Sequence, residues 1–442
     1  MSAPRLVGLF LIAALIAALC VPDTSTSAQV KLPPTIKPGG SFPGGGLPKT
    51  PPPTTPPPSG GKNPSPMQPN SPGGPSSPGF PGSGGSGKPG EKKDNVKWPE
   101  KVGGKTVDEI VKDMKSSDPA IREGAVRTLP AFGPKGREFG GTALVDMMTK
   151  DSDISVRAAA LEVAATVLYH YAKAPDTTLT NGIAAMVRSL GATQLAVRLA
   201  AVGAIGSIGP YVRTPEPKIL ALLTTQAKES SSWQFRRIAV AALGSVGQGV
   251  PLNEEGDKRD APDRLAVTSL LDILKNDACD VVQRDAVTTL IGLGPVAGDQ
   301  QKKWRADLDY VIKTEKDKSI VLWTRVCILR NDPSGVEGNL AHLEAVAKVL
   351  EAPEAQGRLE ACNAFGILGE EGKSKLEALL GIIDNAKEEP AVVGAAIMAV
   401  ATMKSQLKII LPALQRAQLH PNEDVRKVAT EAILVVTGQK KN

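Results

Sequence analysis

The chain has 442 residues, of which 41% are hydrophobic and only 3% aromatic, so any core is built mainly from small aliphatic side chains. The formal net charge of +6 would favour nucleic acid if it fell on a folded region. Residues 29–95 carry seven lysines against two acidic residues, whereas residues 96–442 hold 44 basic and 43 acidic residues. The larger region is therefore nearly neutral, and we expect no nucleic-acid partner.

The first 28 residues have the pattern of an export signal. Arg5 precedes the apolar run Leu6–Val21, and Thr26-Ser27-Ala28 offers small residues for cleavage after Ala28. The 16-residue run is short for a bilayer span. We therefore expect a signal peptide over residues 1–28 and an exported protein, periplasmic, secreted or in the cell envelope. Two alternatives remain: an uncleaved membrane anchor, and a lipoprotein acylated at Cys20.

Residues 29–95 have the composition of a disordered linker. Residues 31–90 contain 19 prolines and 15 glycines, and such a stretch cannot bury enough apolar surface to fold. Its proline clusters favour extended polyproline II, so the segment would act as a tether or stalk. Through it and the signal, the protein could associate with the envelope.

From residue 96 onward the pattern is helical. Thr106 begins a capping helix with acidic residues in its first turn, and Asp118-Pro119 begins the next helix. Leucines at three- and four-residue spacing then predict a series of further helices. These cover residues 141–149, 181–190, 219–228, 265–275, 340–350 and 375–385.

Between these helices one phrase recurs, with VRLAAVGAIG at Val197–Gly206 as its clearest copy. An apolar residue precedes an arginine, and small residues follow three and seven positions later. Aligned on the arginine, the copies fall at Arg122, Arg157, Arg198, Arg236, Gln283, Leu322, Arg358, Val393 and Arg426. The intervals run from 33 to 47 residues, and a period near 40 with two helices per unit predicts an α-solenoid over residues 96–440.

This pattern resembles HEAT repeats, in particular the short bacterial type often labelled PBS-lyase-like. The resemblance implies an all-α, right-handed α-α superhelix of about nine helix pairs that acts as an interaction scaffold. It also implies that each arginine bonds an acidic residue at the preceding turn. That acid is four positions earlier in the pairs Arg122–Asp118, Arg157–Asp153 and Arg358–Glu354. Arg198 and Arg236 face Gln194 and Ser232 instead, so we expect this ladder to be interrupted in the middle repeats.

No motif for catalysis, cofactor binding or metal binding is present in the sequence. There is no Walker loop, Rossmann fingerprint, GxSxG elbow or Cys-x-x-Cys, and none of the three histidines precedes a glutamate. We therefore predict a protein that is not an enzyme, has no cofactor and has no small-molecule substrate. The cysteines after the signal, Cys279, Cys327 and Cys362, are odd in number, and we expect Cys327 and Cys362 to be inert core thiols.

The longest interval contains an insertion, Gly244–Pro262, that carries charges and turn residues. Insertions in solenoids often lie on the binding face. Candidate partner-binding residues in and beside it are Trp233, Arg237, Glu254, Glu255, Lys258 and Arg259. Trp304 and Trp323 are further possible anchors, although single tryptophans at helix junctions more often serve in packing. The sequence thus predicts a protein-binding scaffold whose partner docks between about Ser189 and Arg330. The alternatives are an envelope spacer without a binding face and a hydrolase or cofactor protein whose site is not visible in sequence.

Overall fold

Helices account for nearly all of the structure, a computed structural model that describes residues 97–172, 174–252, 259–296, 298–332 and 334–438. The predicted signal peptide (1–28) and linker (29–95) lie outside the described residues. So do Glu254, Glu255 and Lys258 of the candidate binding set.

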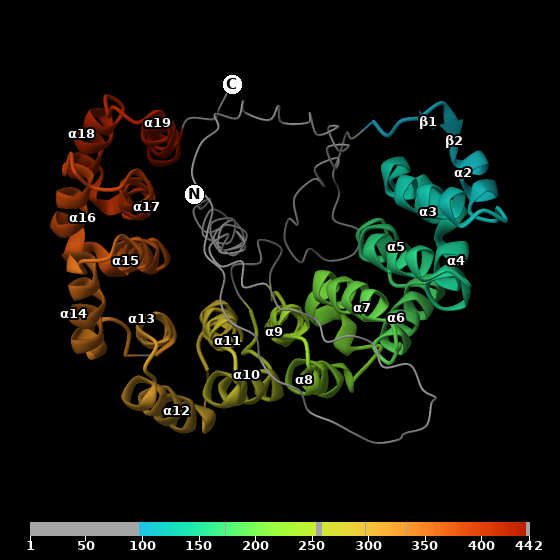
Figure 1. The fold of residues 1–442 in the computed structure, drawn as a ribbon, viewed down its shortest axis with the longest axis horizontal. Helices are drawn as coiled ribbons and strands as arrows, with labels where there is room; N and C mark the ends of the chain where they lie inside the picture. Colours follow the sequence, from blue (N-terminus) through green and yellow to red (C-terminus); the bar gives the residue numbers. More distant parts are fainter. Residues whose placement is uncertain (1–96, 173, 253–258, 297, 333, 439–442) are drawn as a thin grey trace, which may run out of the picture. The chain divides into compact units, whose positions relative to one another are not determined.

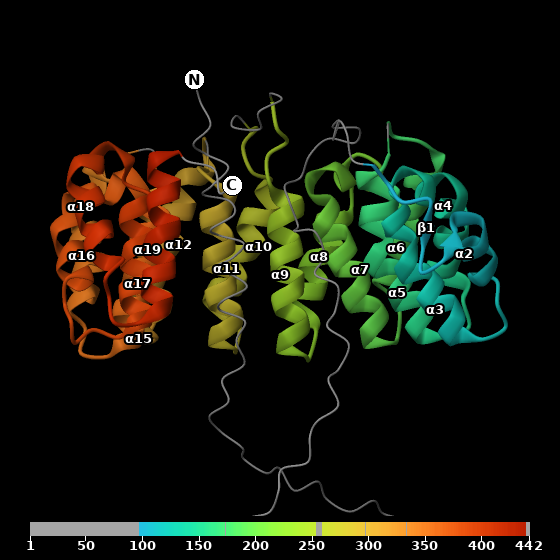
Figure 2. The same cartoon turned by 90° about the horizontal axis from the view of Figure 1, so that it is seen from above.

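The described helices form two layers (Figures 1 and 2). The layer that carries the repeated arginine position, here called the arginine layer, contains α3 (Pro119–Thr128), α5 (Ile154–Ala164), α7 (Leu195–Ile208), α9 (Trp233–Gly247), α11 (Asp280–Leu293), α13 (Lys318–Asn331), α15 (Ala355–Leu368), α17 (Pro390–Ala401) and α19 (Glu423–Thr437). The flanking layer contains α2 (Val107–Asp113), α4 (Pro134–Lys150), α6 (Thr177–Ser189), α8 (Ile219–Glu229), α10 (Arg264–Asn276), α12 (Gln300–Thr314), α14 (Leu340–Lys348), α16 (Leu376–Ile383) and α18 (Leu407–Ala417). Successive helices of the arginine layer pack on one another, which confirms the solenoid and its nine helix pairs within the described residues.

Short turns of helix join several of these elements: η1 (Leu129–Phe132), η2 (Ala165–His170), η3 (Gly209–Arg213), η4 (Glu337–Asn339), η5 (Val349–Glu351), η6 (Gly369–Lys375) and η7 (Lys404–Gln406). Of these, η2 is a π-helical turn at the end of α5. Two short strands, β1 (Lys101–Val102) and β2 (Lys105–Thr106), precede α2 as an antiparallel hairpin. The sequence pattern did not predict this hairpin, because two-residue strands are too short to show alternation.

Small side chains allow the arginine-layer helices to approach closely. Ala201 and Ala239 have no exposed surface, as expected for residues at the stacking positions. A Cβ atom on Gly244 of α9 would lie only 2.0 Å from the Thr289 side chain of α11. Because that contact leaves no room for a side chain, Gly244 belongs to the packed helix rather than to the insertion, which begins after Gly247.

The helix caps at the amino-terminal end of the array are those that the sequence predicts. Thr106 and Glu109 form a capping box at the start of α2, and Asp118 caps α3.

The alignment of repeats is wrong by one residue at α13. There the N-cap is Asp317, four positions before Val321, so the arginine position corresponds to Val321 and not to Leu322.

Among the described residues, one continuous helical stretch, Leu195–Arg213, is long and apolar enough to cross a bilayer, and a second exists only if Pro390–Ala401 and Lys404–Ala417 count as one bent span. In the first stretch, 56% of the apolar window is buried inside the structure. Helix α7 packs between α5 and α9, and this position in the core accounts for its composition.

Candidate functional site

All six predicted ladder arginines make one bond in common. Each donates an Nη1 hydrogen to the backbone carbonyl six residues earlier, at the turn that precedes its own helix. For Arg122, Arg157, Arg198, Arg236, Arg358 and Arg426 the acceptors are the carbonyls of Ser116, Asp151, Ala192, Ser230, Ala352 and His420, at 2.9, 2.5, 3.4, 2.9, 2.7 and 2.8 Å. The arginine therefore holds its helix to the turn before it.

Three of these arginines also reach the next repeat. The edge formed by Nε and Nη2, here called the fork, binds both oxygens of a carboxylate in the turn that precedes the next arginine-layer helix; we call such a pair a rung. The rungs are Arg122–Asp151 (2.8 and 2.8 Å), Arg236–Asp277 (2.8 and 2.8 Å) and Arg358–Glu388 (3.0 and 2.7 Å). The three carboxylate side chains are only 5–7% exposed. Each rung is a bidentate, nearly buried link between neighbouring repeats.

The prediction that each arginine pairs with the acidic residue four positions earlier is wrong. Asp118 and Asp153 accept backbone N–H groups as helix N-caps. Glu354 lies at the N-cap of α15, while Arg358 bonds Glu388. The expected loss of the ladder at Arg236 is also wrong, because its carboxylate comes from the following turn. A short sequence spacing suggested the nearer acid, but the carboxylates of Asp118 and Asp153 are already committed to their helix ends.

The rungs shift the acid–base equilibria of their members. In each rung arginine the hydrogen bond to the carboxylate is the largest cause of a raised pKa. The bond from Arg358 holds the pKa of Glu388 below its usual value. Burial alone would raise the pKa of Asp151, yet the hydrogen bonds from Arg122 and from the Asp153 amide leave it lowered. The rung carboxylates Asp151 and Glu388 therefore stay ionised into the acid range, and the stability they contribute is lost only as the pH falls through their lowered pKa values.

The ladder is interrupted at two successive arginines, Arg157 and Arg198. The positions that correspond to Asp151 and Asp277 hold Ala192 and Ser230, so within the described residues neither fork has a carboxylate. Arg157 bonds only backbone carbonyls.

The fork of Arg198 is incompletely bonded. Its Nε is buried without a hydrogen-bond partner, and its guanidinium lies over the Phe235 ring at 5.4 Å. The predicted interruption is confirmed for this part of the array, between α5 and α9.

A row of exposed apolar side chains coincides with this gap. Ile154, Leu195 and Trp233 are each the first residue of their helix, three positions before the arginine, and are 44, 42 and 40% exposed. Residues three apart share a helix face, so each lies beside its own arginine. The other arginine-layer helices begin with Pro119, Asp280, Lys318, Ala355, Pro390 and Glu423. We call Ile154, Leu195 and Trp233 the apolar row.

The candidate binding set from the sequence is divided between the two ends of α9. Trp233 lies at the amino-terminal end, with the Arg237 guanidinium 5.9 Å from its ring centre and bonded to Asp285. Arg259 lies beyond the carboxyl-terminal end, where it bonds the side chain of Gln248 at 3.0 Å. A helix of 15 residues separates the two places by about 22 Å. They do not form one site.

The loop that Arg259 belongs to closes on itself. Pro251 and Arg259 form an isolated bridge, and the Asp263 amide bonds the Gly247 carbonyl at 2.8 Å. Figure 2 shows the described parts of the loop, residues 248–252 and 259–262, at one end of the helices. Trp304 and Trp323 are 1% exposed and belong to the core, so they serve in packing and not as interface anchors.

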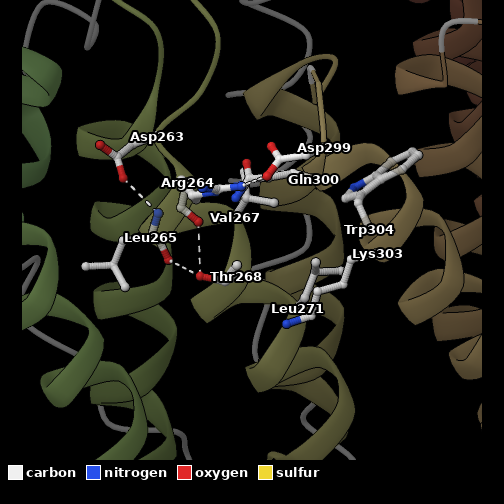
Figure 3. A pocket seen from close by; sticks show the side chains of 10 residues that line it. All are labelled: Asp263, Arg264, Leu265, Val267, Thr268, Leu271, Asp299, Gln300, Lys303 and Trp304. Carbon is white, nitrogen blue, oxygen red and sulfur yellow. Dashed lines mark hydrogen bonds and ion pairs between the residues drawn. The ribbon is translucent and has the colours of Figure 1, made fainter.

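A depression with a volume of about 620 Å³ lies between α10 and α12 (Figure 3). An ion pair between Arg264 and Asp299 crosses it, and Leu271 and Trp304 contribute apolar lining. Thr268 donates its hydroxyl hydrogen to backbone carbonyls of its own helix. The depression holds no histidine, cysteine or serine that could serve as a nucleophile or base.

Titratable groups elsewhere have structural surroundings. His342 lies between Arg305 and Arg325, at 3.1 and 3.0 Å, and burial and then these two cations lower its pKa. Burial raises the pKa of the Cys327 and Cys362 thiols to about 12, as expected for inert core cysteines. Among the described residues no group of three or more His, Cys, Asp or Glu side chains could hold a metal ion.

Comparison with known proteins defines the class: residues 141–244 match the family of HEAT repeats. The helix pairs before and after this match keep the same two-layer arrangement, so the described region is an α-solenoid of which residues 141–244 match HEAT repeats. No curated protein matches the chain.

Three solved structures illustrate the likeness. Importin beta in an ammonium sulfate crystal has 14% identity, covering 74% of this chain and 46% of that one, with a TM-score of 0.48. Kap95p bound to RanGDP has 14% identity, coverage of 76 and 46% and a TM-score of 0.49. A homology model of the AP-3 complex has 14% identity, coverage of 73 and 55% and a TM-score of 0.44. The chain spans about half the length of the structures that it matches.

Proposed function

We propose that this protein is a non-enzymatic scaffold that binds a protein partner through the apolar row. The observation that carries the proposal is the register: Ile154, Leu195 and Trp233 are large, exposed and equivalent in three consecutive repeats. Scattered exposed apolar residues need no explanation, but three at equivalent positions of consecutive repeats favour an interface. Tryptophan is also the residue type most enriched among interface anchors.

The surroundings of the row support the same proposal. The turns before α7 and α9, residues 191–194 and 230–232, contain no charged side chain. The corresponding turns of other repeats carry Asp151 and Asp153, or Asp277. A partner can therefore cover the part of this edge around Leu195 and Trp233 without desolvating carboxylates of these two turns. HEAT-type arrays commonly present such repeated surfaces to other proteins.

We also propose that the protein works outside the cytoplasm, with residues 1–28 as an export signal and residues 29–95 as a tether. The support is compositional: the apolar run Leu6–Val21 behind Arg5, and the density of proline and glycine after it. Intact-mass measurement of the purified protein tests this. Loss of residues 1–28 supports cleavage, a retained Met1–Ala28 segment supports an anchor, and an acylated Cys20 supports a lipoprotein.

A pull-down with purified full-length protein, performed on the exported fraction, tests the binding proposal. The double variant Leu195→Ser, Trp233→Ser removes two members of the row. The matched control is Leu265→Ser, which removes a residue of equal exposure (42%) from the flanking layer. We expect a stoichiometric partner that the control retains and the double variant loses. Equal retention by both variants would move the interface away from the row.

A further inference from the structure

The tether carries a periodic pattern that matches the spacing of the apolar row. Prolines recur at every third residue from Pro66 to Pro81, six in all, and residues 63–87 contain no charged side chain. We infer that Pro66–Pro81, here called the proline segment, docks along the apolar row of its own chain as a polyproline II helix and competes there with the protein partner. The inference rests on the proposed function, because it names what occupies the same row before the partner binds.

The period of three sets the geometry of the proline segment. A polyproline II helix has three residues per turn and rises about 3.1 Å per residue, so prolines at this period share one face at intervals of about 9.3 Å. Equivalent residues of neighbouring repeats are separated by the distance between packed helix axes, about 8–10 Å. Helix α7 packs on both α5 and α9, so Ile154, Leu195 and Trp233 follow one another at that interval. Three successive prolines can therefore meet the three members of the row.

The chemistry of the two surfaces also agrees. Proline-rich segments dock against aromatic side chains, and their preformed helix has little conformational freedom to lose. Within the part of the chain that the structure describes, no group accepts the indole N–H of the exposed Trp233, so it is available to a carbonyl of the proline segment. The turns at residues 191–194 and 230–232 are uncharged, as the segment is, so their contact desolvates no charge there.

The chain between the proline segment and the array is long enough for docking in cis. Residues 82–96 can span up to about 50 Å when extended. The described chain enters the array at Trp98, whose ring lies edge-on to Tyr171 with 5.4 Å between ring centres. Tyr171 directly follows the helical stretch Ile154–His170, which is about 25 Å long and leads back to the first member of the row. The last member lies two repeats further, about 16–20 Å, so the whole row is within reach.

The sharpest test moves prolines off the shared face without changing the composition of the tether. Two Ser-Pro exchanges give the shifted variant, Ser71→Pro, Pro72→Ser, Ser77→Pro, Pro78→Ser. It retains no three successive prolines at the period of three. The control makes the same kind of exchange in the other proline cluster of the tether, as Thr55→Pro, Pro56→Thr, Pro58→Ser, Ser59→Pro. Neither variant changes the charge, the length or any residue of the array.

The first readout is the accessibility of Trp233 to acrylamide. It is the difference in fluorescence quenching between each full-length protein and its Trp233→Phe counterpart, which removes the signal of the other tryptophans. We expect Trp233 to be quenched less in the unmodified protein and in the control than in the shifted variant. Equal quenching in all three would overturn the inference. Protection that grows with protein concentration would place the segment on a second copy and would also overturn docking in cis.

The second readout is the affinity for a labelled peptide that covers Pro66–Pro81. A tethered segment competes at an effective concentration of about 1 mM, so for a peptide Kd of about 0.1 mM the unmodified protein should bind about tenfold more weakly than the shifted variant. Adding Leu195→Ser, Trp233→Ser to the shifted variant should abolish binding, whereas adding Leu265→Ser should not. No binding by the shifted variant, affinity equal to that of the unmodified protein, or binding that ignores the row would each contradict the inference.

The pull-down separates this inference from the proposed function. At limiting partner concentration the shifted variant should retain more partner than the unmodified protein, because its row is free. Retention that depends on Leu195 and Trp233 but is equal for these two proteins would leave the scaffold proposal standing and overturn this inference. Peptide binding that depends on the row, together with partner retention that does not, would overturn the scaffold proposal and leave the docking of the proline segment standing.

Discussion

The rung between Arg236 and Asp277 can be tested by Asp277→Asn, which removes one charge and little volume. In the unmodified protein the carboxylate accepts Nε and Nη2 of Arg236 at 2.8 Å each and the Cys279 amide at 2.9 Å. The two side chains are 13 and 6% exposed. Breaking such a pair leaves an uncompensated, nearly buried guanidinium, and measured losses for buried pairs are about 3–5 kcal/mol. Because asparagine can still accept one of these bonds, we expect a loss near the lower end, about 3 kcal/mol.

The control for this experiment is Asp272→Asn on the neighbouring helix α10. Asp272 pairs with Lys228 at 2.5 Å, but the two side chains are 46 and 37% exposed. An exposed pair of this kind contributes about 0–1 kcal/mol. Both variants neutralise one aspartate in the same repeat, so their difference isolates the effect of burial and bidentate geometry.

Urea unfolding followed by circular dichroism gives the measurement. A solenoid can unfold in segments, so the midpoint and the breadth of the transition are both recorded. We expect Asp277→Asn to lower the midpoint and to split or broaden the transition, because the rung links two repeats. An apolar replacement of both partners, Arg236→Met with Asp277→Leu, should recover much of the loss. A loss for Asp277→Asn no greater than that of the control would refute the reasoning.

Three further predictions concern thiols, pH and the loop. A thiol reagent at mildly alkaline pH should modify Cys279 in the native protein, while burial keeps Cys327 and Cys362 unmodified until the chain unfolds; fast labelling of either would contradict their packing. The pKa of His342 is lowered in the folded protein, so its stabilising contribution is present above the ordinary pKa near 6.5 and is lost as the pH falls through the pKa of the folded state. The variant His342→Gln should therefore flatten the decline in melting temperature between about pH 7 and pH 5. Shortening residues 249–260 to a glycine–serine turn should leave both stability and partner retention unchanged in the pull-down, since the apolar row lies at the other end of α9; lost retention in a stable variant would assign the partner to the loop.

The fold followed from the sequence because repetition multiplies a weak signal. Any single copy, such as Val197–Gly206, could be an isolated helix, but nine registered copies constrain one another. The alignment is wrong by one residue where the arginine itself is absent, at Val321. In α11, where Gln283 holds the arginine position, the adjacent Arg284 reaches Asp317 in the turn before α13 at 3.6 Å. A pattern keyed to one residue type loses its register where that residue is absent.

The site was less predictable because its determinants are distributed over distant positions. The sequence left anchoring and packing open for all three tryptophans of this region; Trp233 is exposed, while Trp304 and Trp323 fill the core. Burial depends on which helix face a residue occupies, and aromatic identity alone carries no such information. The significance of Ile154 and Leu195 appears only after the helix starts are aligned, since each is then the first helical residue.

The ladder gap and the apolar row have a common physical basis in the turns before α7 and α9. A buried ion pair adds little to stability over a well-packed apolar contact, because desolvation offsets most of the Coulomb attraction. Replacing a rung with the contact between Arg198 and Phe235 therefore need not weaken the array. What the replacement changes is the balance of charge at this edge, because Arg157 and Arg198 are retained without a carboxylate and each lies beside an exposed apolar side chain, Ile154 or Leu195.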